Sequence, residues 1–126
     1  MIAIFIISYL IACISAGAIG DALNDKGKQN AGHIVIALEA LLALVGATIF
    51  SVTPDTLIAY VSVYIGLRIA FFDIIYNITS GRPILSMGSS NLWDRFFSKY
   101  PPVGVIFMRV IFLSLAVGLS FKFFNI

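Results

Sequence analysis

Residues 34–52 read IVIALEALLALVGATIFSV and contain a single charged side chain, Glu39. A transmembrane helix needs about 20 mostly apolar residues, and this stretch meets that requirement. Similar stretches occur at residues 1–20, 56–78 and 103–123. Because a lipid-facing strand would leave backbone groups unpaired, each stretch predicts a helix. We therefore expect an all-α polytopic integral membrane protein, with four transmembrane helices in a single transmembrane domain over residues 1–126.

The composition of the whole chain points to the same class of protein. Hydrophobic residues make up 60% of the 126 residues and charged residues 11%, whereas soluble domains are typically about a quarter charged. A soluble fold of this size could not bury so much apolar surface. The net charge of +2 comes from few side chains, so the dense basic surface of a nucleic-acid-binding protein is missing. We expect membrane lipid as the surroundings and no nucleic-acid partner.

A short amphipathic helix is predicted at about residues 90–100, between the third and fourth spans. Its aromatic residues recur at spacings of three and four, and its polar residues fill the other side. Because Trp and Tyr prefer the level of the lipid headgroups, we expect the helix to lie flat on the membrane surface. A helix that binds a protein partner is the alternative. The expected interfacial anchors are Trp93, Phe96, Phe97 and Tyr100.

The distribution of basic residues predicts an orientation in the membrane. The polar segments 21–33 and 80–102 fall on one side and carry most of the lysines and arginines, whereas the short turn between the second and third spans carries only Asp55. The positive-inside rule places segments 21–33 and 80–102 on the cytoplasmic (basic) side. Both termini are then expected outside.

Glu39, Arg68, Asp73 and Arg109 are charged residues well inside the predicted spans. A charge near the middle of a bilayer costs about 2.5–3.5 kcal/mol on insertion scales, so each of them needs a partner, water or a shallow position. From the rise per residue, Glu39, Asp73 and Arg109 each lie about 9 Å inside the basic-side boundary. We expect these three to satisfy one another, either as a structural ion-pair network or as the lining of a polar pathway.

Arg68 is predicted to behave differently from the other three. It lies five positions before Asp73, about 140° around a helix, so the two do not share a face. It shares a side with aromatic residues, which favours a cation–π contact. An interface with a second copy or another subunit is the alternative. The aromatic residues are Tyr60, Tyr64, Phe71 and Phe72.

Small residues predict how the helices pack. The second span has a stripe containing Gly32, Glu39 and Gly46, and small side chains let helices approach closely in lipid. From Ala12 to Gly20 the first span has small side chains around nearly its whole circumference, which predicts a central position in the bundle.

One possible metal site lies at the basic side. Asp21 and Asp25 stand four apart, and His33 follows the polar segment, so the three could hold a divalent cation. The sequence favours the other interpretation, in which the two carboxylates pair with lysines or with Arg82. No phosphate loop, zinc spacing or haem motif occurs, and no cofactor is expected.

These observations support three hypotheses of function. The first is a non-catalytic membrane subunit that packs with copies of itself or with larger partners, in a cellular complex or a viral membrane. The second is a small oligomeric pore, holin-like channel or transporter in which Glu39 and Asp73 face water. The third is a membrane enzyme that acts on lipid headgroups through Asp21, Asp25 and His33.

Overall fold

The fold is all-helical in the part of the chain that the structure, a computed structural model, describes: residues 1–84, 96 and 99–124. Four helices are long and apolar enough to span a membrane, as expected for a multi-pass membrane protein. They are α1 (Ile2–Asp25), α2 (Gln29–Phe50), α3 (Pro54–Ser80) and α5 (Pro102–Phe124). The predicted fold class of four transmembrane helices is confirmed. Of the predicted interfacial anchors, Trp93 and Phe97 lie outside the described residues, whereas Phe96 and Tyr100 are exposed and their rings lie 5.6 Å apart.

The helices extend beyond the predicted spans at the end of the bundle that carries the polar segments. Helix α1 continues to Asp25, and α2 already begins at Gln29. Backbone hydrogen bonding does not require apolar side chains, so a helix can continue past the hydrocarbon. The link between them turns at Gly27, whose φ of 80° favours glycine.

Both ends of α3 are set by local sequence. Thr53 accepts a hydrogen bond from the backbone N–H of Thr56 at 3.3 Å, and Pro54 occupies the first turn. At the other end Gly81 adopts a left-handed conformation with φ of 71°. The backbone N–H of Arg82 then bonds to the Asn77 carbonyl at 2.9 Å. This is how glycine commonly ends a helix.

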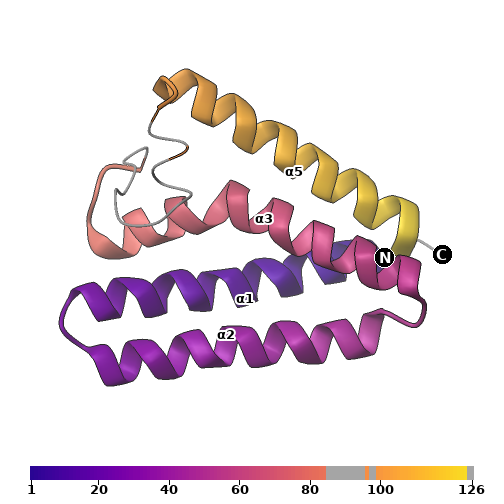
Figure 1. Cartoon of the computed structure of the whole chain (residues 1–126), viewed down its shortest axis with the longest axis horizontal. Helices are drawn as coiled ribbons and strands as arrows, with labels where there is room; N and C mark the ends of the chain where they lie inside the picture. Colours follow the sequence, from indigo (N-terminus) through magenta and orange to yellow (C-terminus); the bar gives the residue numbers. More distant parts are fainter. Residues whose placement is uncertain (85–95, 97–98, 125–126) are drawn as a thin grey trace.

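Helix α1 is the central element of the bundle. It packs against α2, α3 and α5, whereas α2 and α3 touch each other far less. Figure 1 shows the order α2, α1, α3 and α5 across the molecule, with the N-terminus, the α2–α3 turn and the end of α5 at one end. The prediction that the first span is central is confirmed. The buried core is drawn mainly from α1 and α3 and includes Ile6, Leu10, Ile14, Val63 and Leu67.

Glycines bring the helices of two pairs close together. A Cβ atom at Gly20 of α1 would lie 2.9 Å from the carbonyl oxygen of Gly32 on α2. A Cβ atom at Gly66 of α3 would lie 3.1 Å from the carbonyl oxygen of Phe112 on α5. Within the described chain, the buried residues of α2 are Gly32, Glu39 and Gly46, the three named above for the predicted stripe.

Candidate functional site

Glu39 is a buried carboxylate with 4% of its surface exposed, although it belongs to the least buried helix. Its side chain lies against Gly17 of α1, in space that the Cβ of any larger residue would fill. Helix α1 lies between most of α2 and α3, so this position lets a side chain of α2 cross to α3. We call this space the Gly17 gap.

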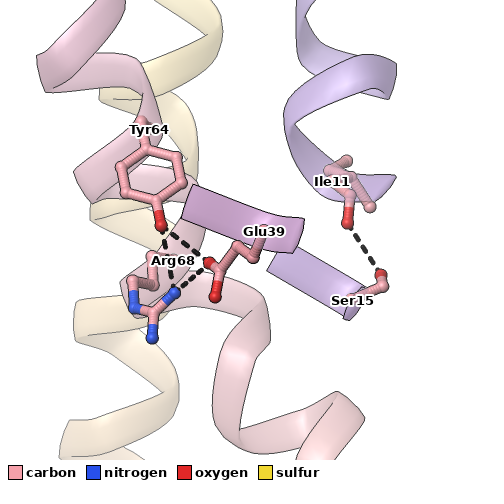
Figure 2. Close-up of polar contacts among 5 residues, drawn as sticks. All are labelled: Ile11, Ser15, Glu39, Tyr64 and Arg68. Atoms are coloured by element: carbon pink, nitrogen blue, oxygen red, sulfur yellow. Dashed lines mark hydrogen bonds and ion pairs between the residues drawn. The ribbon is translucent and has the colours of Figure 1, made fainter. Parts of the chain in front are cut away.

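Two side chains of α3 meet the Glu39 carboxylate on the far side of the Gly17 gap. The Tyr64 hydroxyl donates a hydrogen bond of 2.7 Å to Glu39 Oε1. Arg68 Nη1 forms an ion pair with the same oxygen. Nη1 also donates to the Tyr64 hydroxyl at 3.1 Å. Figure 2 shows the three side chains converging from two helices. We call Glu39, Tyr64 and Arg68 the Glu39 cluster.

Arg68 lies near the middle of α3, with about 21 Å of helix before it and about 18 Å after it. Its guanidinium carbon lies 4.3 Å from the centre of the Phe72 ring, a cation–π contact of the kind expected from the sequence. Its side chain is nevertheless 37% exposed. In Figure 2 the two guanidinium nitrogens other than Nη1 point away from Glu39. The Glu39 cluster is therefore closed around the carboxylate but open on one side of the guanidinium.

The second pair of internal charges lies between α3 and α5. Arg109 Nη2 and Asp73 Oδ2 are 3.5 Å apart, and the side chains are 9% and 29% exposed. The expectation that Glu39, Asp73 and Arg109 satisfy one another is therefore corrected: Glu39 pairs with Arg68 instead. Arg68 and Asp73 lie on different sides of α3, so one faces Glu39 and the other faces α5. Equal depth did not bring Glu39 to Arg109 because their helices lie on different sides of the bundle.

At the end of the bundle that carries the polar segments, α1 and α3 are joined by contacts of another kind. The Tyr76 hydroxyl donates to Asp25 Oδ2, and Lys26 Nζ donates to the Thr79 carbonyl at 2.8 Å. The Arg82 guanidinium lies 5.4 Å from the Tyr76 ring centre. Asp25 is thus bonded to a tyrosine, whereas the sequence favoured a lysine or Arg82 as its partner.

The possible metal site is not assembled. Within the described residues, no group of three or more His, Cys, Asp and Glu side chains could hold a metal ion. Asp21 and Asp25 belong to α1, and His33 is exposed on α2. The structure therefore does not bring Asp21, Asp25 and His33 together as a ligand set.

Sequence reasoning missed two members of the buried site. Tyr64 was expected beside Arg68, but not as a hydrogen-bond donor to Glu39. Gly17 was recognised only as one of many small residues in its helix. A usable signal was the spacing of Tyr64, Arg68 and Phe72 at intervals of four, which puts all three on one side of a helix. Nothing in the sequence marks Gly17 above the other glycines.

The chemistry of the Glu39 cluster is that of a structural tie. A carboxylate that accepts from an arginine and a tyrosine is neutralised and held in place. The other side of the cluster, the exposed edge of Arg68, remains able to bind an acceptor. Comparison of the chain with protein-family models, curated proteins and solved structures finds no match in any of the three.

Proposed function

We propose that this protein is a non-catalytic subunit of a membrane complex, packing with copies of itself or with larger partners in a cellular or viral membrane. The observation that carries the proposal is the 37% exposure of Arg68 in the middle of a transmembrane helix. Glu39 and Tyr64 engage only Nη1 of its guanidinium. In hydrocarbon the remaining N–H groups would lack acceptors, which is costly. A neighbouring subunit would provide them.

The outer surface of α2 supports the same proposal. Few residues of this helix are buried, and the side that faces away from them is largely apolar and exposed. Lipid or another helix can cover such a surface, because apolar area alone does not distinguish the two in a bilayer. Arg68 distinguishes them, since lipid tails accept no hydrogen bond. The exposed residues of α2 include Ile34, Leu38, Leu41, Leu44, Val45 and Ile49.

The pore and the enzyme receive less support. A pore would need Glu39 and Asp73 to face water, but Glu39 is buried and both are in ion pairs. An enzyme using Asp21, Asp25 and His33 would need these side chains to converge. We therefore rank the subunit first and keep the pore as the alternative that the experiment must separate from it.

We further propose the orientation that the positive-inside rule favours, with the α1–α2 link and the segment before α5 on the cytoplasmic (basic) side. Figure 1 shows the α1–α2 link, the end of α3 and the start of α5 opposite the α2–α3 turn. The basic residues in or next to these segments support the orientation: Lys26, Lys28, Arg82 and Lys99. Both termini are then outside.

Native mass spectrometry of the protein from mild detergent, combined with a dye-leak measurement in liposomes, tests the proposed function. A subunit is expected to appear as an oligomer or with partner chains, and its liposomes are expected to hold dye. Liposomes that leak dye, with the leak lost on Asp73→Asn, would instead identify the oligomeric pore. A monomer without leak would also contradict the proposal.

A further inference from the structure

We infer that the exposed edge of Arg68 binds a carboxylate on a transmembrane helix of a different polypeptide. This inference rests on the proposed function, because it names the chemistry of the partner that a membrane subunit would have. It is carried by the geometry of the guanidinium, its depth in α3 and the positions of the chain's own carboxylates.

The guanidinium has one edge available. Nη1 carries two N–H groups, which are directed to Glu39 and to the Tyr64 hydroxyl. Phe72 covers a face of the plane. What remains is the edge formed by Nε and Nη2, which Figure 2 shows turned away from Glu39. We call this the Arg68 fork. Two parallel N–H groups in one plane match the two oxygens of a carboxylate.

The guanidinium also retains N–H donors to offer. Glu39 forms an ion pair with Arg68 through Nη1, and Asp21 of the same chain interacts with Arg68 electrostatically. A further acceptor at the Arg68 fork would meet charge-assisted N–H donors, which bond more strongly than neutral ones. A low-dielectric setting strengthens such an interaction relative to water.

The depth of Arg68 favours an acceptor inside the membrane over the phosphate of a lipid. About 18 Å of helix separates Arg68 from the nearer end of α3. The hydrocarbon core is about 30 Å thick, so a residue near the centre of a span lies away from both headgroup layers. A transmembrane helix can place an acceptor at this depth.

A second copy of this chain lacks a suitable carboxylate among its described residues. Glu39 is buried, and Asp73 is paired with Arg109. Asp25 and Asp55 lie at helix ends, and Asp21 lies in the last turns of α1. Asp21 is only partly exposed and already interacts electrostatically with Arg68 of its own chain. The carboxylate is therefore expected from another polypeptide.

The surface around the Arg68 fork suits a helix. Val61 and Ile65 are exposed on α3 and precede Arg68 by seven and three residues. Together with Phe72 they make a stripe along one side of α3. A partner helix lying along this stripe would set its carboxylate against the Arg68 fork and its apolar residues against Val61 and Ile65.

The experiment uses the full chain in liposomes and synthetic helices as probes. The helices are leucine-rich, about 20 residues long, and identical except for one central position that holds Glu, Gln or Leu. A fourth helix has its Glu near one end. An acceptor dye on Lys28→Cys, an exposed position, reports binding of donor-labelled helices by energy transfer. Cys13 is buried and is expected not to take the dye.

The helix with the central Glu is expected to bind about tenfold more tightly than the other three. This preference should vanish in the double variant Glu39→Gln/Arg68→Met, which removes the Arg68 fork without leaving an unpaired buried carboxylate. The matched double variant Asp73→Asn/Arg109→Met removes the other internal pair and is expected to keep the preference.

Equal binding of the central Glu, Gln and Leu helices would overturn the inference. A preference for the central-Glu helix that remains in Glu39→Gln/Arg68→Met would also overturn it. So would energy transfer between donor- and acceptor-labelled copies of the chain that does not fall when the central-Glu helix is added. The proposed function fails separately, when the chain is monomeric by native mass spectrometry. If the chain forms oligomers but binds the central-Glu helix no better than the other helices, the proposed subunit function is retained. The inference of an acidic partner helix is then wrong.

Discussion

At the scale of single residues, the internal charges of this protein form two pairs with different surroundings. The Glu39–Arg68 pair contains a carboxylate that is almost fully buried and an arginine that is partly exposed. The Asp73–Arg109 pair has the opposite distribution, with the arginine better buried than the carboxylate. Removing one member of a buried pair leaves the other uncompensated, whereas removing both often costs little. The two members of each pair should therefore be strongly coupled.

Arg68→Met is expected to lower the free energy of unfolding by about 3 kcal/mol, because Glu39 is left buried with only the Tyr64 hydroxyl. Partial exposure of Arg68 puts this value at the lower end of the range for buried pairs. Glu39→Gln/Arg68→Met should cost less than Arg68→Met alone. Unfolding by denaturing detergent, followed by circular dichroism, measures all the variants. Additive losses in the double-mutant cycle would show that the pair is not coupled.

At the scale of helices, α1 separates most of α2 from α3, and side chains bridge the two helices at glycines. The Gly17 gap is the reason that Glu39 reaches Tyr64 and Arg68. A similar gap lies at Gly46 of α2, where a Cβ atom would meet Tyr9 and Tyr60. The Tyr60 hydroxyl donates to the Ala43 carbonyl there at 3.0 Å. Glycines in this bundle thus leave room for side chains that form hydrogen bonds between helices, and they also allow backbones to pack closely.

Gly17→Ala is expected to destabilise the bundle by about 1–3 kcal/mol, because the added methyl group occupies the space of the Glu39 carboxylate. The matched control is Gly118→Ala in α5, where a Cβ atom would meet nothing within 4 Å. That substitution should be neutral or slightly stabilising, since alanine favours helices. The same detergent unfolding assay compares the two variants. A Gly17→Ala protein as stable as the Gly118→Ala protein would show that Glu39 does not depend on the gap.

The sequence predicted the helices and part of their packing, but it did not predict the partner of Glu39. Hydrophobic length and small-residue spacing are local properties, so the spans and the stripe of Gly32, Glu39 and Gly46 could be read directly. The choice between Arg68 and Arg109 depends on where each helix lies around the bundle. Counting residues gives the depth of a side chain in the membrane, but it does not show which helices are neighbours in the bundle. The residues that decided the pairing, Gly17 and Tyr64, act only through tertiary packing.

At the scale of the whole molecule, the bundle has two unlike ends (Figure 1). One end holds the α1–α2 link and the start of α5, and its contacts are polar, including Lys26 with the Thr79 carbonyl. The opposite end holds the α2–α3 turn and a group of aromatic rings, in which Phe50 stacks on Tyr60 at 6.4 Å between centroids. This asymmetry makes the orientation in the membrane an experimentally accessible property.

Single cysteines at exposed positions near the two ends should react from opposite sides of the membrane. In the proposed orientation, Lys28→Cys and Lys99→Cys are labelled by an impermeant maleimide only from the cytoplasmic (basic) side, and Val52→Cys only from the other. Buried Cys13 serves as the internal negative control and should remain unlabelled in the parent protein. Labelling of Lys28→Cys and Val52→Cys from the same side would contradict the four-span topology. Labelling of each from the reverse side would invert the orientation.

The bond across the Gly17 gap also has a consequence for biosynthesis. Helices are synthesised in chain order, so α1 and α2 reach the membrane before α3 does. During that interval Glu39 lacks both of its partners, which are supplied by α3. An unpaired carboxylate in the bilayer costs about 2.5–3.5 kcal/mol, so we expect the hairpin of α1 and α2 to be less stable on its own than in the complete bundle. The third helix should therefore stabilise the two helices that precede it in the chain.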